Sequence, residues 1–123
     1  MPIIHAPRTA THDIEALRFT SLATPSRGSS ETAVWHVEIE AGAPAAPHSL
    51  TREEVFVVLD GIASVRIGGV TGLATTGDAI VVPADTEFEL SNAADSLLRL
   101  LCCLPVGGQA RLDGATFTPP WAE

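Results

Sequence analysis

Two side chains near the middle of the chain, His48 and Glu54, could carry chemistry. An imidazole titrates near neutral pH, so His48 can act as a polar anchor or as a general acid or base in a pocket. A carboxylate buried among apolar residues has a raised pKa unless a positive charge, here His48 or Arg52, balances it. His48 and Glu54 are therefore candidates for a catalytic acid/base couple. The alternatives are a histidine that only hydrogen-bonds its neighbours and a buried ion pair that only stabilises the fold.

Arg52 and Cys102 are further candidates for contacts with a ligand. Arg52 lies in a predicted turn and could receive a ligand carboxylate, although such a residue is more often a solvated charge. The adjacent Cys102 and Cys103 point to opposite faces of a strand, so we expect no disulfide between them. If Arg99 points outward, Cys102 faces the interior, where apolar surroundings make a thiol inert. We expect two buried, reduced thiols whose role is packing.

Strands must position these residues, because the apolar side chains alternate with a period of two. In residues 34–40, Trp35, Val37 and Ile39 fall on one face and His36 on the other, which is the pattern of a half-buried strand. Trp35 belongs in the core or in a pocket wall. The same alternation argues against His36 as a metal ligand, although it is the candidate if a replacement ligand exists.

Further strands are predicted at residues 54–59, 62–67, 79–83, 87–90 and 96–104. Asp60-Gly61 predicts a β-hairpin with a type I′ turn between the first two of them. Gly68-Gly69 and Gly77-Asp78 predict the next turns.

Helical periodicity is weak throughout the chain. Residues 12–19 offer at most one short helical turn, and residues 23–32 are typical of a polar loop. The tail from Gly107 has the composition of an extended arm that docks on its own chain or on a partner. Strands of this length and spacing predict an all-β sandwich or barrel. We expect a single domain over residues 1–123, with a core at about 18–106 and an arm at each end.

Residues 42–61 resemble the first sequence motif of the cupin superfamily. That motif contains a glycine, a His-x-His pair, a glutamate and a second glycine at set spacings. Gly42, His48, Glu54 and Gly61 keep every spacing, and Leu50 stands where the family has the second histidine.

Residues 77–92 resemble the second cupin motif, which contains a glycine, a Pro-x-Gly unit, a histidine and an asparagine. Gly77, Pro83 and Asn92 match it, Asp85 stands at the glycine position after the proline, and Phe88 stands at the histidine position. The two resemblances together imply a double-stranded β-helix, in which two sheets face each other around a pocket. They also imply a homodimer, since cupins are often dimeric.

In the cupin family, the three histidines and the glutamate usually hold one divalent metal ion. This chain keeps only His48 and Glu54 of the four. A tight site for a transition metal generally needs three or more protein ligands. We therefore expect no metal cofactor. The alternative is a divalent transition metal held by His48 and Glu54, with the site completed by water, His36 or a ligand atom.

Leu50 and Phe88 are expected to point into the pocket, where the missing imidazoles would lie. Burial of a ligand's apolar surface against them contributes roughly 25 cal/mol per Å². This predicts a cavity for a small, partly apolar molecule with one polar handle. The predicted ligand-binding residues are Leu50, Phe88, Arg52, Phe56, Trp35 and Cys102.

The composition excludes some other partners. The net charge of −8 comes from fifteen acids and seven arginines, with no lysine. The arginines are scattered singly, whereas a phosphate backbone needs clustered cations. The apolar runs are too short to cross a bilayer, and the first residues have no pattern of a secretion signal. We expect a cytoplasmic protein that binds neither nucleic acid nor a membrane.

Three functions remain open at this point. The first is a metal-free cupin that binds a small molecule and, if it is an enzyme, acts as an acid/base isomerase or cyclase. The second is a metal-dependent, dioxygenase-like cupin with a degenerate site. The third is a non-catalytic, dimeric sensing or structural module with a filled interior, which would leave no cavity beside Phe88.

Overall fold

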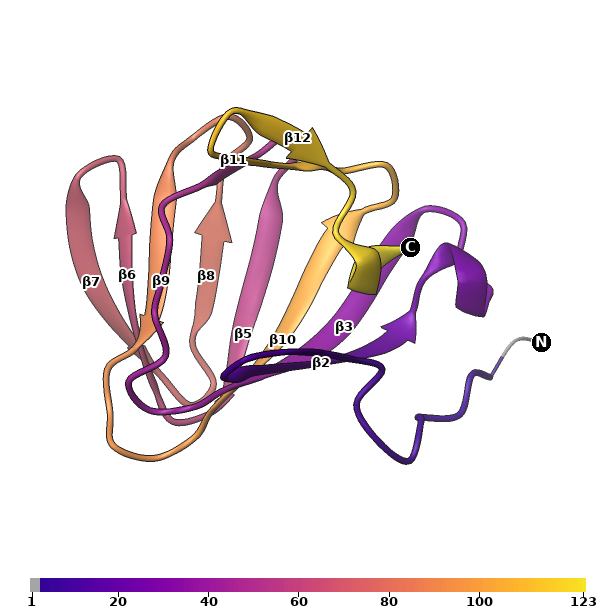
Figure 1. Cartoon of the computed structure of the whole chain (residues 1–123), viewed down its shortest axis with the longest axis horizontal. Coiled ribbons are helices and arrows are strands. Elements are labelled where there is room, and N and C mark those ends of the chain that lie inside the picture. Colours follow the sequence, from indigo (N-terminus) through magenta and orange to yellow (C-terminus); the bar gives the residue numbers. More distant parts are fainter. Residues whose placement is uncertain (1–2) are drawn as a thin grey trace.

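The structure is a computed structural model that describes residues 3–123, and in that range it has twelve strands and two short 3-10 helices (Figure 1). None of these helices is long and apolar enough to span a bilayer. The predicted all-β class is confirmed. The elements are β1 (His12–Ile14), β2 (Leu17–Ala23), η1 (Pro25–Arg27), β3 (Thr32–Ile39), β4 (Ser49–Leu50), β5 (Glu54–Asp60), β6 (Ile62–Ile67), β7 (Val70–Thr75), β8 (Ala79–Val82), β9 (Phe88–Asn92), β10 (Leu98–Pro105), β11 (Ala110–Leu112), β12 (Ala115–Phe117) and η2 (Pro120–Ala122).

The strands form one large sheet and two small ones. The large sheet has the order β1-β2-β3-β10-β5-β8, and the small sheets have the orders β7-β6-β9 and β12-β11-β4. In Figure 1 the β7-β6-β9 sheet stands at the left, and the β11–β12 hairpin crosses the top of the molecule. The chain passes repeatedly between layers: β5 belongs to the large sheet, β6 and β7 to a small one, and β8 to the large sheet again.

The layers are not closed into one continuous hydrogen-bonded barrel, which corrects the barrel that we predicted. β4 has only two residues, and a single bridge between His48 and Phe88 connects the chain just before it to β9. Pro44 and Pro47 precede that bridge, and a proline has no N–H with which to extend a ladder. This side of the molecule is therefore held by few backbone hydrogen bonds.

Alternating side chains from the central strands build the core. On β3, Ala33, Trp35, Val37 and Ile39 are buried, and on β10 every second residue from Leu98 to Leu104 is buried as well. Antiparallel pairing aligns Cys102 with Trp35 on one side and with Phe56 on the other. Full burial of a Val, Leu or Phe side chain contributes about 1.5–3 kcal/mol, so these rows supply much of the folding free energy.

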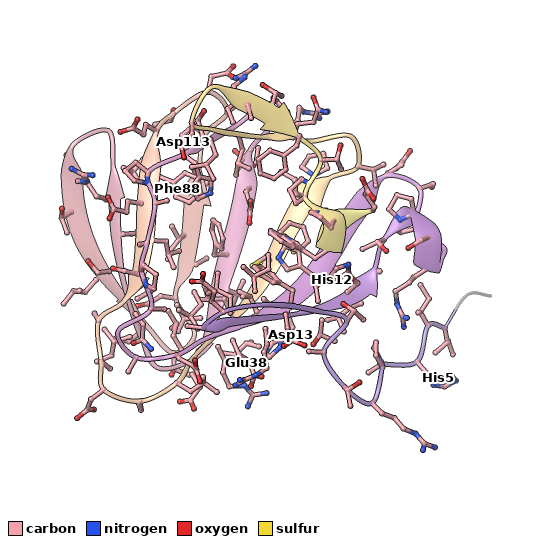
Figure 2. All side chains as sticks on the ribbon, viewed as in Figure 1. His5, His12, Asp13, Glu38, Phe88 and Asp113 are labelled. Atoms are coloured by element: carbon pink, nitrogen blue, oxygen red, sulfur yellow. The ribbon has the colours of Figure 1, made fainter. Side chains whose placement is uncertain are left out.

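The outer face of the large sheet carries both apolar side chains and a row of charges. Val81 and Leu59 are 51% and 41% exposed there. Glu38 on β3 pairs with Arg18 on β2 at 3.2 Å and with Arg99 on β10 at 3.7 Å. Figure 2 shows Glu38 on the side of the sheet away from the interior. The predicted homodimer stays a prediction.

The hairpin predicted at Asp60-Gly61 is wrong. β5 pairs with β10 and β8, whereas β6 pairs with β7 and β9, so the chain crosses here from one sheet to the other. Gly61 has a φ of 98°, and a Cβ at this position would lie 2.9 Å from the Leu97 carbonyl oxygen. The glycine is needed for this close approach rather than for a hairpin. The turns at Gly68-Gly69 and Gly77-Asp78 are confirmed.

Both ends of the chain are more ordered than the sequence predicts. Residues 12–19 hold β1 and the start of β2, not a helical turn, because β2 pairs with β3 and buries Phe19. The tail forms β11, β12 and η2 and packs on its own chain. Strands therefore extend beyond residues 18–106 on both sides.

A pair of glycine variants tests the crossing at Gly61. Gly61 and Gly69 both have positive φ values, 98° and 85°, but an added Cβ meets backbone only at Gly61 and meets nothing within 4 Å at Gly69. We expect Gly61→Ala to lower the free energy of unfolding by about 2 kcal/mol more than Gly69→Ala, since overpacking adds to the backbone strain that both share. Urea denaturation measures the difference, and equal losses in the two variants would contradict it.

Candidate functional site

A cavity of about 290 Å³ lies between the layers. Its walls come from β2, β3, β5, β9 and β10, from the loop before β4, and from the C-terminal segment. Almost all of its lining is apolar. All six aromatic residues of the chain contribute to it: Phe19, Trp35, Phe56, Phe88, Phe117 and Trp121.

Leu50 and Phe88 both line this cavity, and each is only 2% exposed. Phe88 lies inside the molecule on β9 (Figure 2). Leu50 is held by pairing with Ala110 and by its carbonyl, which accepts a hydrogen bond of 2.7 Å from the Asp85 amide. Asp85 has a φ of 59°, in the left-handed region that glycine adopts most easily. This conformation explains why the second cupin motif has a glycine at the position that Asp85 occupies here. The prediction that positions 50 and 88 face the interior is confirmed.

His48 lines the cavity, and one of its ring nitrogens has a hydrogen-bond partner in the chain. Its backbone exchanges two hydrogen bonds with Phe88, of 3.0 and 2.8 Å, and its ring centroid lies 4.4 Å from that of Phe88. Its Nδ1 lies 2.9 Å from the Ala46 carbonyl oxygen. A carbonyl oxygen only accepts, so Nδ1 carries the hydrogen, and in the neutral ring Nε2 is left as an acceptor.

Glu54 is a buried acid without a counter-charge. It begins β5, where Glu54, Phe56 and Val58 alternate inward, and it is 5% exposed at the cavity wall. Burial alone raises its pKa to about 8. The ion pairs formed within residues 3–123 do not include it, so the expected balance by His48 or Arg52 is absent. At neutral pH the carboxyl is largely protonated.

Arg52 and His36 lie away from the cavity. Arg52 is exposed in the bend before β5, so the structure does not bring it to a ligand in this cavity. His36 points to the outer face of the large sheet, where burial, and then the nearby Arg99, lower its pKa. Its Nε2 is buried and has no hydrogen-bond partner in the described structure. His36 is thus not brought together with His48 and Glu54.

Trp35, Phe56 and Cys102 line the cavity, as predicted for ligand-binding residues. Burial raises the pKa of the Cys102 thiol, and the neighbouring Glu54 raises it further, so this thiol is a poor nucleophile. Cys103 is only half-buried, which corrects the expectation of two buried thiols. Both cysteines are free, as expected.

The residues at the cavity do not provide the set of ligands with which cupins usually hold a metal ion. His48 and Glu54 line the cavity, but hydrocarbon side chains fill the other two ligand positions. Within residues 3–123, no group of three or more His, Cys, Asp or Glu side chains is placed to hold one ion. Two donors fall short of a tight transition-metal site.

The sequence did not reveal that the C-terminal segment forms part of the cavity wall. The Trp121 ring stacks on Phe19 with a centroid distance of 3.7 Å and an angle of 6° between the ring planes. The Ser21 hydroxyl donates to the Trp121 carbonyl oxygen at 2.8 Å. Phe117 is 37% exposed and marks the rim of the cavity. The signal available in the sequence was the presence of two aromatic residues, Phe117 and Trp121, in a proline-rich tail.

The buried acid predicts an unusual dependence of stability on pH. The folded pKa of Glu54 is about 8 and the ordinary value is 4.5, so the folded state holds the proton more tightly between these values. The stability contributed by this group is complete below pH 4.5 and is lost as the pH rises toward 8, by up to roughly 1.4 kcal/mol per pH unit. Glu54→Gln should therefore exceed the wild type in stability by a margin that widens across this range.

Urea denaturation at several pH values measures that margin. Glu53→Gln is the matched control, because Glu53 is exposed and adjacent. Parallel curves for the wild type and Glu54→Gln between pH 5 and pH 8 would show that Glu54 is not an unpartnered buried acid.

Several solved structures are similar to this chain. The cupin domain of Cnp3 from Schizosaccharomyces pombe has 22% identity and a TM-score of 0.62, over 79% of this chain and 65% of that one. A salicylate 1,2-dioxygenase mutant from Pseudoaminobacter salicylatoxidans, in complex with gentisate, has 17% identity and a TM-score of 0.70, over 87% of this chain and 31% of that one. A putative ethanolamine utilization protein, EutQ, from Salmonella typhimurium has 23% identity and a TM-score of 0.60, over 87% and 71%.

At these identities the likenesses show the fold alone, and the chain spans about two thirds of the Cnp3 domain and a third of the dioxygenase. No curated protein matches the sequence. The family model described as the cupin domain matches residues 35–104, which is more than half of the chain and includes both motifs. The chain belongs to the cupin family.

Proposed function

We propose that this cupin binds a small, largely apolar molecule in the cavity, without the metal ion that cupins often hold. The observation that carries the proposal is the position of Leu50 and Phe88. Both hydrocarbon side chains occupy metal-ligand positions of the motifs and face a cavity of about 290 Å³. Ligand pockets typically have volumes of about 300–1,000 Å³, apolar walls and a few convergent polar groups, so this cavity falls near the small end.

His48 and Glu54 supply the polar contacts for the ligand. The Nε2 of His48 accepts a hydrogen bond in the neutral ring, and the Glu54 carboxyl donates one when it is protonated. They form no ion pair with each other, so each acts on the ligand separately. Burial of about 200 Å² of ligand surface would contribute roughly 5 kcal/mol, from which the cost of association must be subtracted.

The two alternatives have less support. The likeness to the salicylate dioxygenase favours a metal-dependent enzyme, but at 17% identity it concerns the fold. A filled, purely structural module would leave no cavity beside Phe88, and Phe88 lines one.

Binding of a neutral apolar probe, 2-phenylethanol, tests the proposal. Both tryptophans line the cavity, so their fluorescence reports occupancy. We expect a saturable change in the wild type. Ala43→Phe should weaken binding at least tenfold, because Ala43 lines the cavity and a larger side chain there fills it. Ala41→Phe is the matched control, since Ala41 is exposed and outside the lining. Equal affinity in both variants, or no saturable change in the wild type, would refute the proposed function.

Restoration of the histidines tests the metal part of the proposal. We expect the wild type, purified without chelator, to hold far less than one equivalent of transition metal by elemental analysis. The double substitution Leu50→His and Phe88→His should gain stoichiometric zinc binding, because it restores four donors. The control, Leu90→His with Leu112→His, also places two imidazoles at the cavity but leaves both Leu50 and Phe88 in place. If the wild type holds one equivalent of metal and His48→Ala loses it, the proposal that this cupin works without a metal ion is wrong.

A further inference from the structure

An ionised Glu54 would have no arginine or lysine beside it in the part of the chain that the structure describes. The carboxyl lies at the wall of a hydrocarbon cavity, and it is 95% buried, since only 5% of the residue is exposed. None of the residues that line the cavity in the described structure is an arginine, and the chain has no lysine. An ionised carboxylate in such a place is stable only when a positive charge comes beside it. A ligand could therefore supply the positive charge beside the Glu54 carboxyl.

Aromatic rings surround the same space. Phe56 follows Glu54 on the inner face of β5, and its ring centroid lies 5.9 Å from that of Phe88. Trp35 lies in the same cross-strand row as Phe56, on the other side of Cys102. A cation is attracted to the face of an aromatic ring within about 6 Å, most strongly to tryptophan and most strongly where water is excluded.

The second polar group in the wall also suits a hydrogen-bond donor on the ligand. Because Nδ1 of His48 is occupied by the Ala46 carbonyl, the ring offers its Nε2 as an acceptor. A protonated amine carries several N–H donors and can use both Nε2 and a carboxylate oxygen. An anionic ligand finds no guanidinium or ammonium partner in the described lining. The net charge of −8 also attracts cations toward the protein and repels anions.

We infer that the cavity selects an organic cation, an ammonium group on a small apolar body, which pairs with Glu54 between the aromatic rings. This inference rests on the proposed function and names the ligand class of the same cavity. The carboxyl is largely protonated in the empty cavity, and an ammonium group beside it favours the ionised form, so binding of the cation releases the proton of Glu54.

Three probes of one shape and different charge test the inference: 2-phenylethylamine, 2-phenylethanol and phenylacetate. Tryptophan fluorescence and calorimetry at pH 7.5 and physiological salt measure their dissociation constants. We expect the amine to bind at least tenfold more tightly than the alcohol, and phenylacetate to bind more weakly than both. In Glu54→Gln the advantage of the amine over the alcohol should fall to less than threefold.

Glu53→Gln removes the same charge from the surface one residue away, so it should keep the full advantage of the amine. If the amine still binds at least tenfold more tightly than the alcohol in Glu54→Gln, the preference comes from the general surface charge and the inference is overturned. If the alcohol binds as tightly as the amine in the wild type, the inference fails while the proposed function stands. If Ala43→Phe binds the alcohol as tightly as Ala41→Phe, or the alcohol does not bind at all, the proposed function itself fails.

Discussion

The carboxyl of Glu54 lies in a wall of hydrocarbon with no cation of its own chain beside it, and the properties of the cavity depend on that placement. The alternation of β5 puts Glu54 on the same face as Phe56 and Val58, so burial follows from the strand rather than from a partner for the charge. Without an opposing charge, burial raises the pKa to about 8. A group that lowers stability as it ionises is tolerated here because the surrounding rows of apolar side chains supply enough folding free energy. Groups whose pKa is shifted in this way are often found at functional sites.

The strands that surround the cavity are joined unequally on its two sides. Around the large sheet, β10 is paired on both sides, with β3 and with β5, and this part of the core is tightly packed. On the opposite side, two-residue β4 and the single bridge between His48 and Phe88 carry the connection. Trp121, stacked on Phe19, covers part of the space that remains. The C-terminal segment thus contributes to the site as well as to the fold.

Within the cupin family, this chain keeps most of the motif residues that shape the backbone and departs from the motifs at two metal-ligand positions. The motif positions that shape the backbone still do so: Asn92 donates to the carbonyl oxygens of Ile39 and Ser96, and Asp85 adopts the conformation that favours glycine. Only two of the ligand positions changed class, to Leu50 and Phe88, and the cavity remained. The polar groups of this cavity include one imidazole and one carboxyl, His48 and Glu54.

Local pattern and motif spacing were enough to predict the all-β class, most of the central strands and the inward positions of Trp35, Glu54, Leu50 and Phe88. A period of two and the spacing of the motifs are properties of short segments, and they survive in any arrangement of the strands. Only the tertiary structure decided four other features. These are the crossing of the chain between sheets at Gly61, the part of the cavity wall that Trp121 forms, the short pairing at β4, and the absence of an ion pair between His48 and Glu54. Each of these depends on contacts between residues far apart in the chain, for which a short segment carries no signal.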